Sequence, residues 1–175
     1  MSMQDDGWIP EDEWKIIVRK MPPIVSVDLI VLHKGGVVLG KRRNEPAKGE
    51  WFVPGGRVKK GERLEDAVHR IAREELGTDV EIKEMLGVYE HFYNTAEIPD
   101  ASKHYVAVAF VVTPIDEKFV PDNQHTEFRV FTSADGLHPY VKQYMADVRK
   151  SILIDLDYTL IWRKGLQMNL KDLVE

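Results

Sequence analysis

The sequence predicts an α/β fold, in which a mixed β-sheet is flanked by helices. Two observations predict it. Segments rich in β-branched and aromatic residues recur at 24–33, 37–42, 51–53, 80–93, 105–113 and 127–131, and two helical segments are interleaved with them or follow them. The length of 175 residues suits one domain with a substantial core.

The chain begins with a segment expected to form a short helix. Pro10 opens it, Trp14, Ile17 and Val18 share one face, and Pro22-Pro23 ends it. We therefore divide the chain into an N-terminal helical segment (1–23), a main domain (24–150) and a C-terminal tail (151–175). The tail is apolar in part, and we expect it to pack on the domain or on a second subunit, which makes a homodimer the expected assembly.

Polar residues and turn-forming residues interrupt or end the strand segments at defined positions. Asp28 interrupts the apolar run 24–33, and Gly35-Gly36 predicts a hairpin turn into the next strand. Pro54-Gly55-Gly56 closes the short strand 51–53. Residues 94–103 are expected to form a polar loop. From His138 onward the spacing predicts a helix with Val141, Tyr144, Met145, Val148 and Ile152 on one face.

The segment 64–76 predicts the central helix, since it has no Pro or Gly and many good helix formers. Leu64, Val68 and Ile71 lie on one apolar stripe, and Glu75 falls in its middle. A carboxylate there is costly to bury unless it is paired, for example by a divalent cation. The alternative is that Glu75 bends to solvent at the helix end, but Gly55-Gly56 and Glu62 nearby favour a metal.

Composition narrows the class of protein. The chain has no cysteine, which excludes disulfides and thiolate metal sites, and it has no apolar run long enough to span a membrane. The acidic, polar start MSMQDDGW does not resemble a signal peptide, so a cytoplasmic location is expected. A net charge of −5 argues against nucleic acid or membrane as partners. The local basic groups, Lys41-Arg42-Arg43 and Arg57 with Lys59 and Lys60, suit a small anionic ligand, although Lys59 and Lys60 are expected to be solvated loop charges.

The run from Gly56 to Gly77, GRVKKGERLEDAVHRIAREELG, resembles the signature of the Nudix hydrolases, G-x5-E-x7-R-E-U-x-E-E-x-G. It departs from that pattern at Ile71, where the family has a glutamate. The resemblance implies an α/β/α sandwich and Mg²⁺-dependent hydrolysis of a nucleoside diphosphate derivative, with Mn²⁺ as an alternative ion. Because Ile71 cannot bind a metal or accept a proton, fewer ions and a base from elsewhere are expected.

Longer stretches resemble one branch of that family, the GDP-mannose mannosyl hydrolases. They include VSVDLIV from Val25, VLGKRRNEPAKGEWFVPGGRV from Val38 and PDNQHTEFR from Pro121. The resemblance implies that water attacks C1 of the hexose in a GDP-sugar, GDP-mannose or GDP-glucose, and releases GDP and free hexose.

The same resemblance implies roles for individual residues. Gly55 (through its carbonyl), Glu75 and Gln124 correspond to metal ligands, and His125 corresponds to the general base. Asp28 corresponds to an acidic group near the sugar. The groups expected around the diphosphate or sugar are Arg42, Arg57, Arg70, His91 and Tyr105. Arg42 and Arg57 would also assist departure of the leaving group, whereas Arg70 has a mainly structural alternative.

Two other functions stay open at this point. One is phosphorus–oxygen cleavage of ADP-ribose or a nucleotide sugar, with Glu62, Glu74 and Glu75 as metal ligands. Glu74 is acidic where the mannosyl hydrolases have a small apolar residue, so a second metal is an option. The other is a non-catalytic nucleotide-binding module.

Overall fold

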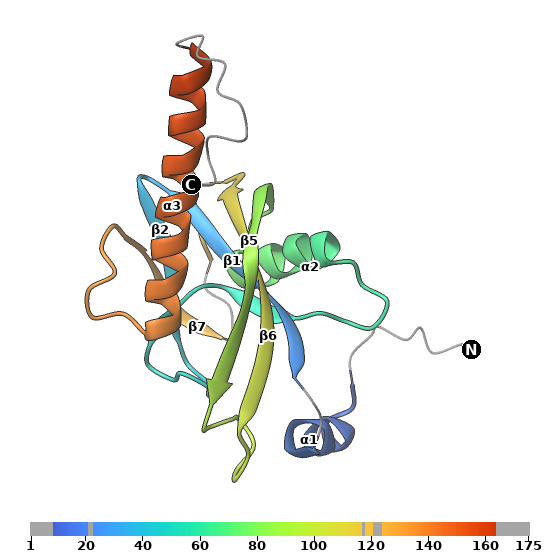
Figure 1. The fold of residues 1–175 in the computed structure, drawn as a ribbon. Helices are drawn as coiled ribbons and strands as arrows, with labels where there is room; N and C mark the ends of the chain where they lie inside the picture. The colour runs from blue at the N-terminus through green and yellow to red at the C-terminus, as the bar shows by residue number, and fades with distance from the viewer. Residues whose placement is uncertain (1–8, 21–22, 117, 121–123, 164–175) are drawn as a thin grey trace, which may run out of the picture.

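The computed structural model describes residues 9–20, 23–116, 118–120 and 124–163. Its elements, in chain order, are α1 (Glu11–Lys20), β1 (Ile24–His33), β2 (Gly36–Arg42), β3 (Trp51–Phe52), β4 (Gly55–Arg57), α2 (Leu64–Ile71), the π-helical turn η1 (Ala72–Leu76), β5 (Val80–Tyr93), β6 (Lys103–Pro114), β7 (His125–Phe131) and α3 (Pro139–Arg163) (Figure 1). The predictions that fall on 1–8, 21–22, 121–123 and 164–175 lie outside the described residues.

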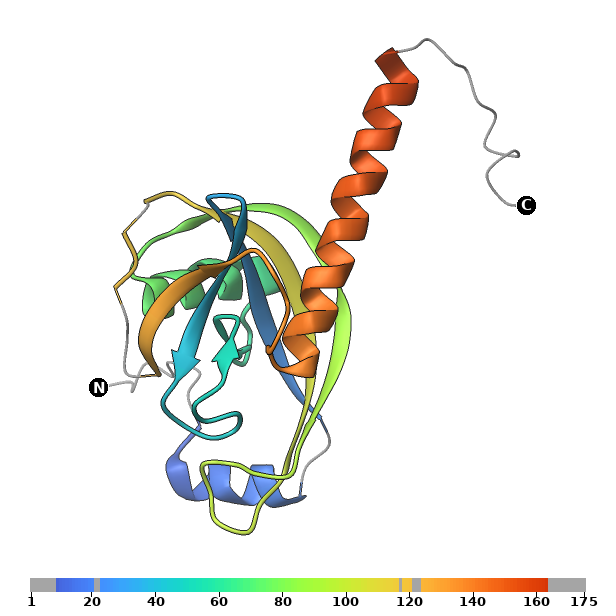
Figure 2. The same ribbon diagram turned by 90° about the vertical axis from the view of Figure 1, so that its left-hand side faces the viewer.

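The sheet is mixed, as predicted. Its main path runs β3-β2-β1-β6-β5, with β4 added to β1 and β7 added to β2. β1 and β6 are parallel from Ile24↔Tyr105 to Val31↔Val112, and the other pairs are antiparallel. α2 covers one face and the first half of α3 covers the other, while the second half of α3 extends beyond the sheet (Figure 2).

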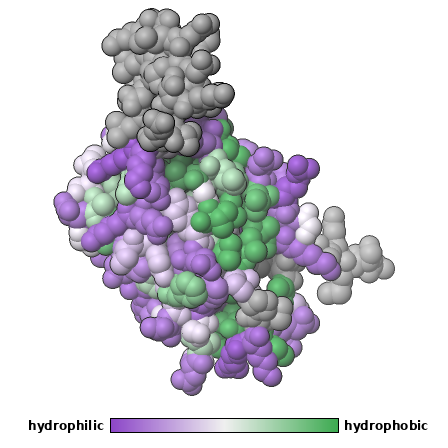
Figure 3. Space-filling model, in the orientation of Figure 1, coloured by the Kyte–Doolittle hydropathy of each residue, from purple (hydrophilic) through white to green (hydrophobic). Residues whose placement is uncertain are grey.

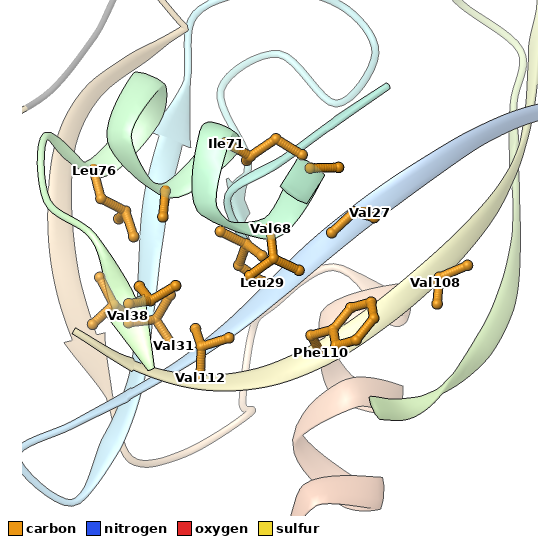
Figure 4. Close-up of a cluster of buried hydrophobic side chains, with 13 residues drawn as sticks. Val27, Leu29, Val31, Val38, Val68, Ile71, Leu76, Val108, Phe110 and Val112 are labelled. Carbon is orange, nitrogen blue, oxygen red and sulfur yellow. The ribbon is translucent and has the colours of Figure 1, made fainter. Parts of the chain in front are cut away.

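Two cores hold these layers together. Beneath α2, Val68, Ile71 and Leu76 point toward Leu29 and other strand residues (Figure 4). On the opposite face, the α3 residues predicted to share one side are buried against the sheet: Val141, Tyr144, Met145 and Val148. Burying a large apolar side chain contributes roughly 1.5–3 kcal/mol, so the two cores provide the main stabilisation.

A third, smaller cluster joins α1 to the connection between β5 and β6. Trp14 and Val18 of α1 pack against Ile98 and Ala101 of that connection. The segment 94–103, predicted to be a polar loop, is therefore partly buried. Its last residue, Lys103, begins β6 and is only 7% exposed. The apolar face of α1 forces this burial, because no other described element covers it.

Two local features differ from the sequence-based expectation. The predicted helix 64–76 is α-helical only to Ile71 and continues as the π-helical turn η1, which ends at Gly77 with φ of 74°. β4 begins within the expected turn Pro54-Gly55-Gly56 and pairs antiparallel with β1, so that Gly55 is opposite Asp28. A three-residue strand rich in glycine has no hydrophobic alternation to predict it.

The surface is mostly hydrophilic, with one group of hydrophobic side chains where β5 and β6 lie (Figure 3). Its exposed members on β5 include Met85, Val88 and Phe92. Among the helices described, none is long and apolar enough to cross a membrane.

Candidate active site

One cavity of about 420 Å³ lies at the edge of the sheet where β1, β4, β5 and β6 meet the α2–η1 helix. Nine of the residues predicted for the site line it together: Asp28, Arg42, Gly55, Arg57, Arg70, Glu75, His91, Tyr105 and Gln124. The tenth, His125, is not among the lining residues. Segments up to a hundred residues apart in sequence thus supply a single site.

The end of the cavity that is predicted to bind a metal ion is formed by Gly55 and Glu75. The Gly55 N–H donates a hydrogen bond of 2.9 Å to Glu75 Oε2, which fixes the carboxylate beside the β4 backbone. The Glu75 carboxylate is an oxygen donor of the kind that a hard divalent cation prefers, and the carbonyl of Gly55 is the second predicted donor. Glu74, the next residue, also lines the cavity. The remaining coordination of such an ion would have to come from substrate oxygens and water.

Gly55 has to be glycine at this point. A Cβ there would lie 2.5 Å from Asp28 Oδ1 and 3.1 Å from the Val27 carbonyl oxygen. Any side chain would therefore push the two strands apart and displace the Asp28 carboxylate. Ile71, which stands where the family has a glutamate, packs against Gly56 and is 1% exposed.

Arg70 joins the motif loop to the helix. Its guanidinium donates to both carboxylate oxygens of Glu62 at 2.6 and 2.9 Å, to Glu74 at 2.9 Å and to the Arg57 carbonyl at 2.8 Å. These bonds raise the pKa of Arg70 and lower that of Glu62. The predicted Arg70–Glu74 ion pair is confirmed, and most of the guanidinium donors are occupied by the protein.

Asp28 is a buried carboxylate with few polar partners. Burial raises its pKa to about 6, while the hydrogen bond from the Tyr144 hydroxyl (2.7 Å) and the charge of Arg42 oppose the rise. His91, which also lines the cavity, lies 3.9 Å from Asp28 through Nδ1. Burial lowers the pKa of His91 to about 4, so its imidazole is neutral at physiological pH. The site can therefore hold one titratable carboxylate next to a neutral imidazole.

Besides Arg70, two arginines line the cavity in different surroundings. Arg42 Nε donates to the Pro46 carbonyl at 2.7 Å, which leaves its charge directed at the cavity and felt by Asp28. The Arg57 guanidinium stacks 3.6 Å from the ring centre of Trp14. Burial lowers the pKa of Arg57. Arg57 is thus held against the N-terminal helix α1.

The far wall of the cavity contains an ion pair that the sequence did not suggest. Lys103 pairs with Glu97, and Glu97 also accepts a 3.0 Å hydrogen bond from Trp14 Nε1. Lys103 lies 5.4 Å from the Tyr105 ring centre. Glu97, Lys103 and Tyr105 thus give this wall an acceptor, a donor and an aromatic ring.

Gln124 and His125, adjacent in sequence, have different surroundings. The Gln124 side chain is exposed, lines the cavity and accepts a 3.0 Å hydrogen bond from Asn44. His125 is fully buried: it begins β7 opposite Arg42, and its ring packs into the space left by Gly40, 5.1 Å from the Phe128 ring centre. In this arrangement the imidazole predicted as general base is buried and is not among the residues that line the cavity.

Two residues that contribute to the site, Tyr144 and Trp14, were predicted from the sequence to have only a packing role. Tyr144 and Trp14 were placed on apolar helix faces, yet each uses its polar atom beside the cavity. A buried Tyr or Trp usually finds a hydrogen-bond partner. Asp28 lies in an apolar strand and Tyr144 on an apolar helix face. These two exceptions to the apolar pattern are the signal from which a contact between them could have been predicted.

Comparison with known proteins agrees with this architecture. The model of the NUDIX domain matches residues 22–152. The low-salt glycan biosynthesis protein Agl8 of Haloferax volcanii is 55% identical over 139 residues, which cover 78% of this chain and 88% of that protein. An ADP-ribose pyrophosphatase of Methanocaldococcus jannaschii is 35% identical over 108 residues, or 61% of each chain.

Solved structures with a similar fold include two from bacteria. A MutT NUDIX hydrolase from Burkholderia pseudomallei superposes with a TM-score of 0.62 at 25% identity, covering 73% of this chain and 98% of that one. A NUDIX hydrolase from Nitrosomonas europaea has a TM-score of 0.55 at 28% identity, covering 74% and 73%.

Proposed function

Since the chain belongs to the Nudix family and is a Nudix hydrolase, we propose that it hydrolyses nucleoside-diphosphate sugars, with GDP-mannose or GDP-glucose as the expected substrate. In the proposed reaction water attacks C1 of the hexose, the C1–oxygen bond breaks, and GDP leaves with the electron pair. The observation that carries this proposal is the buried Asp28 carboxylate, which lies directly beside Gly55 at the end of the cavity that is predicted to bind a metal ion.

The position of Ile71 supports attack at carbon. The side chain at this point of the motif is aliphatic and belongs to the core, so no carboxylate is available there for water activation or for a further metal. Glu62 and Glu74 form ion pairs with Arg70. Glu75 on η1 accepts a hydrogen bond from the Gly55 N–H, and Asp28 on β1 accepts one from the Tyr144 hydroxyl.

Each residue then has a role in the proposal. Glu75, the Gly55 carbonyl and Gln124 would hold Mg²⁺, or Mn²⁺ in its place, which when bound neutralises diphosphate charge. Arg42 and Arg57 would stabilise the departing diphosphate. Asp28, with a pKa of about 6, is suited to accept the proton of water at physiological pH, beside His91 and Tyr105.

The family resemblance and the geometry favour different general bases. The resemblance assigns the role to His125, but the cavity offers Asp28. We expect Asp28→Asn to lower kcat by about 100-fold or more, with the Kd for GDP little changed. His125→Gln is the matched comparison: a similar loss of kcat with folding intact would return the role of general base to His125.

A second candidate function is favoured by one relative. The ADP-ribose pyrophosphatase at 35% identity is named for cleavage at phosphorus, and Glu74 beside Glu75 could support a second ion once released by Arg70. In that reaction a nucleoside monophosphate would be released instead of a diphosphate.

The test is product analysis in ¹⁸O-water with Mg²⁺, offering GDP-mannose, GDP-glucose and ADP-ribose. Labelled hexose with unlabelled GDP is the expected result, whereas labelled phosphate groups would establish attack at phosphorus. Tight GDP-sugar binding without turnover would identify a binding module. Glu75→Gln should abolish most of the Mg²⁺-dependent rate, and Glu65→Gln on the exposed face of α2 serves as its control. The homodimer and the cytoplasmic location stay predictions.

A further inference from the structure

The C-terminal helix reaches the site from behind. Tyr144 of α3 is completely buried and is not among the cavity-lining residues, yet its hydroxyl contacts two of them. It donates to Asp28 Oδ2 at 2.7 Å and lies 3.1 Å from His91 Nε2. One hydroxyl from α3 thus connects a carboxylate on β1 with an imidazole on β5.

Hydrogen counting fixes the direction of these bonds. A phenol has one hydrogen, and an ionised carboxylate can only accept, so the Tyr144 hydrogen goes to Asp28. The contact with His91 then requires that His91 Nε2 carry the hydrogen and donate it to the Tyr144 oxygen. His91 is consequently a neutral imidazole with its hydrogen on Nε2 and a lone pair on Nδ1.

A second tyrosine of α3 fixes the orientation of the same ring. Tyr140 stacks on His91 with ring centres 4.1 Å apart and an interplanar angle of 16°. Its hydroxyl bonds to both the N–H and the carbonyl of Phe92, at 2.8 and 3.1 Å. Tyr140 is therefore held against the backbone next to His91, and the imidazole has little room to rotate.

We propose that Tyr144 and Tyr140 are positioning residues of the active site, which orient the Asp28 carboxylate and hold His91 as the Nε2–H tautomer. In this state Nδ1 of His91 is an acceptor for a hydroxyl of the substrate. The inference rests on the proposed function in one respect, that Asp28 and His91 contact the hexose. The hydrogen-bonding arrangement of Tyr144, Asp28 and His91 can be tested separately.

The first experiment reads the tautomer without any substrate. The six histidines of the full chain are labelled with ¹⁵N, and ring nitrogen shifts are recorded at neutral pH, with His91→Gln to assign the signal. We expect His91 to show a hydrogen on Nε2 in the parent protein, and Tyr144→Phe to produce a mixture of tautomers. A hydrogen on Nδ1 in the parent, or no change in Tyr144→Phe, would overturn the proposal.

The second experiment separates positioning from packing. Tyr144→Phe keeps the ring in the core and removes only the hydroxyl, and we expect kcat to fall about 10- to 100-fold while KM and the Kd for GDP change less than about twofold. Tyr89→Phe is the matched control, since Tyr89 on β5 also bonds to α3, through Asp147 at 3.2 Å, without a hydrogen bond to Asp28 or His91. It should leave kcat unchanged.

A double-mutant cycle decides whether Tyr144 acts through Asp28. If it does, adding Tyr144→Phe to Asp28→Asn should reduce kcat by less than about threefold further, because the group it orients is already gone. Full additivity of the two losses would overturn the positioning role. If no nucleotide sugar is hydrolysed at all, the proposed function fails, but the tautomer experiment still decides the arrangement of His91.

Discussion

At the scale of single residues, Asp28 shows how surroundings determine what a side chain can do. Its ordinary pKa is 3.8, and burial raises it to about 6 in the folded protein. The folded state therefore binds this proton more tightly than the unfolded state does. The resulting stabilisation is fully present below pH 3.8 and is lost as the pH rises through 6. Above that pH, an ionised Asp28 costs stability.

The first prediction follows from this sign. The side chain of the Asp28→Asn variant cannot ionise. The free energy of unfolding of the variant minus that of the parent should therefore be more favourable at pH 7.5 than at pH 4, by on the order of 2 kcal/mol. Urea unfolding at both pH values, with EDTA to remove metal ions, measures the difference. An equal effect of the substitution at the two pH values would contradict the raised pKa.

Residue patterns predicted the members of the site better than their arrangement. The motif predicted Arg70, Glu74 and Glu75 on one helical segment, and in the structure Glu75 accepts a hydrogen bond from Gly55. The sequence could not show that His125 lies inside while Gln124 faces the cavity. Which of these side chains is buried depends on the register in which β7 pairs with β2, and that register shifts between Gly40 and Arg42.

At the scale of elements, the motif helix changes from an α-helix to a π-helical turn before it ends at Gly77. The helical period predicted the apolar stripe of residues 64–71 correctly, because burial against the sheet enforces it. The switch to the π-helical turn η1 has no such periodic signal. Its end at Gly77 does have one, since only glycine adopts a φ of 74° without strain. A π-turn is often found beside functional residues, and here it contains Glu74 and Glu75.

The second prediction concerns that glycine. A Cβ at Gly77 would lie 3.0 Å from Val120 Cβ, in addition to the strained φ. Gly77→Ala should lower the free energy of unfolding by roughly 2–3 kcal/mol. Gly61→Ala is the control, because Gly61 has a φ of 77° with nothing within 4 Å of a Cβ, and it should cost about 1 kcal/mol. Thermal or urea unfolding compares the two, and equal losses would show that the contact with Val120 is unimportant.

At the scale of the whole molecule, the two faces of the sheet depend on helices of different origin. α2 belongs to the motif, whereas α3 follows the last strand and was predicted from spacing alone. Four of its buried residues, Val141, Tyr144, Met145 and Val148, cover the second face. At roughly 1.5–3 kcal/mol each, their burial is comparable to the entire net stability of a typical domain.

The third prediction therefore compares two shortened chains. A chain that ends after residue 138 should not unfold cooperatively, because one sheet face would be uncovered. A chain that ends after Ser151 keeps these four residues and the 2.6 Å hydrogen bond from Ser151 to Glu84, and it should melt within a few degrees of the parent. Calorimetry distinguishes them. A cooperative transition in the shorter chain would show that α3 is dispensable for folding.

The parallel pairing of β1 with β6 has a consequence during synthesis. Residues 24–31 pair with residues 105–112, so the centre of the sheet cannot close until residue 112 has left the ribosome. The hydroxyl that reaches Asp28 comes later still, at residue 144. The helical segment that contains Glu75 is thus made before β6 and α3, and the site stays incomplete until α3 has been made. Any activity that depends on the contact between Tyr144 and Asp28 would therefore begin only after residue 144 has been made.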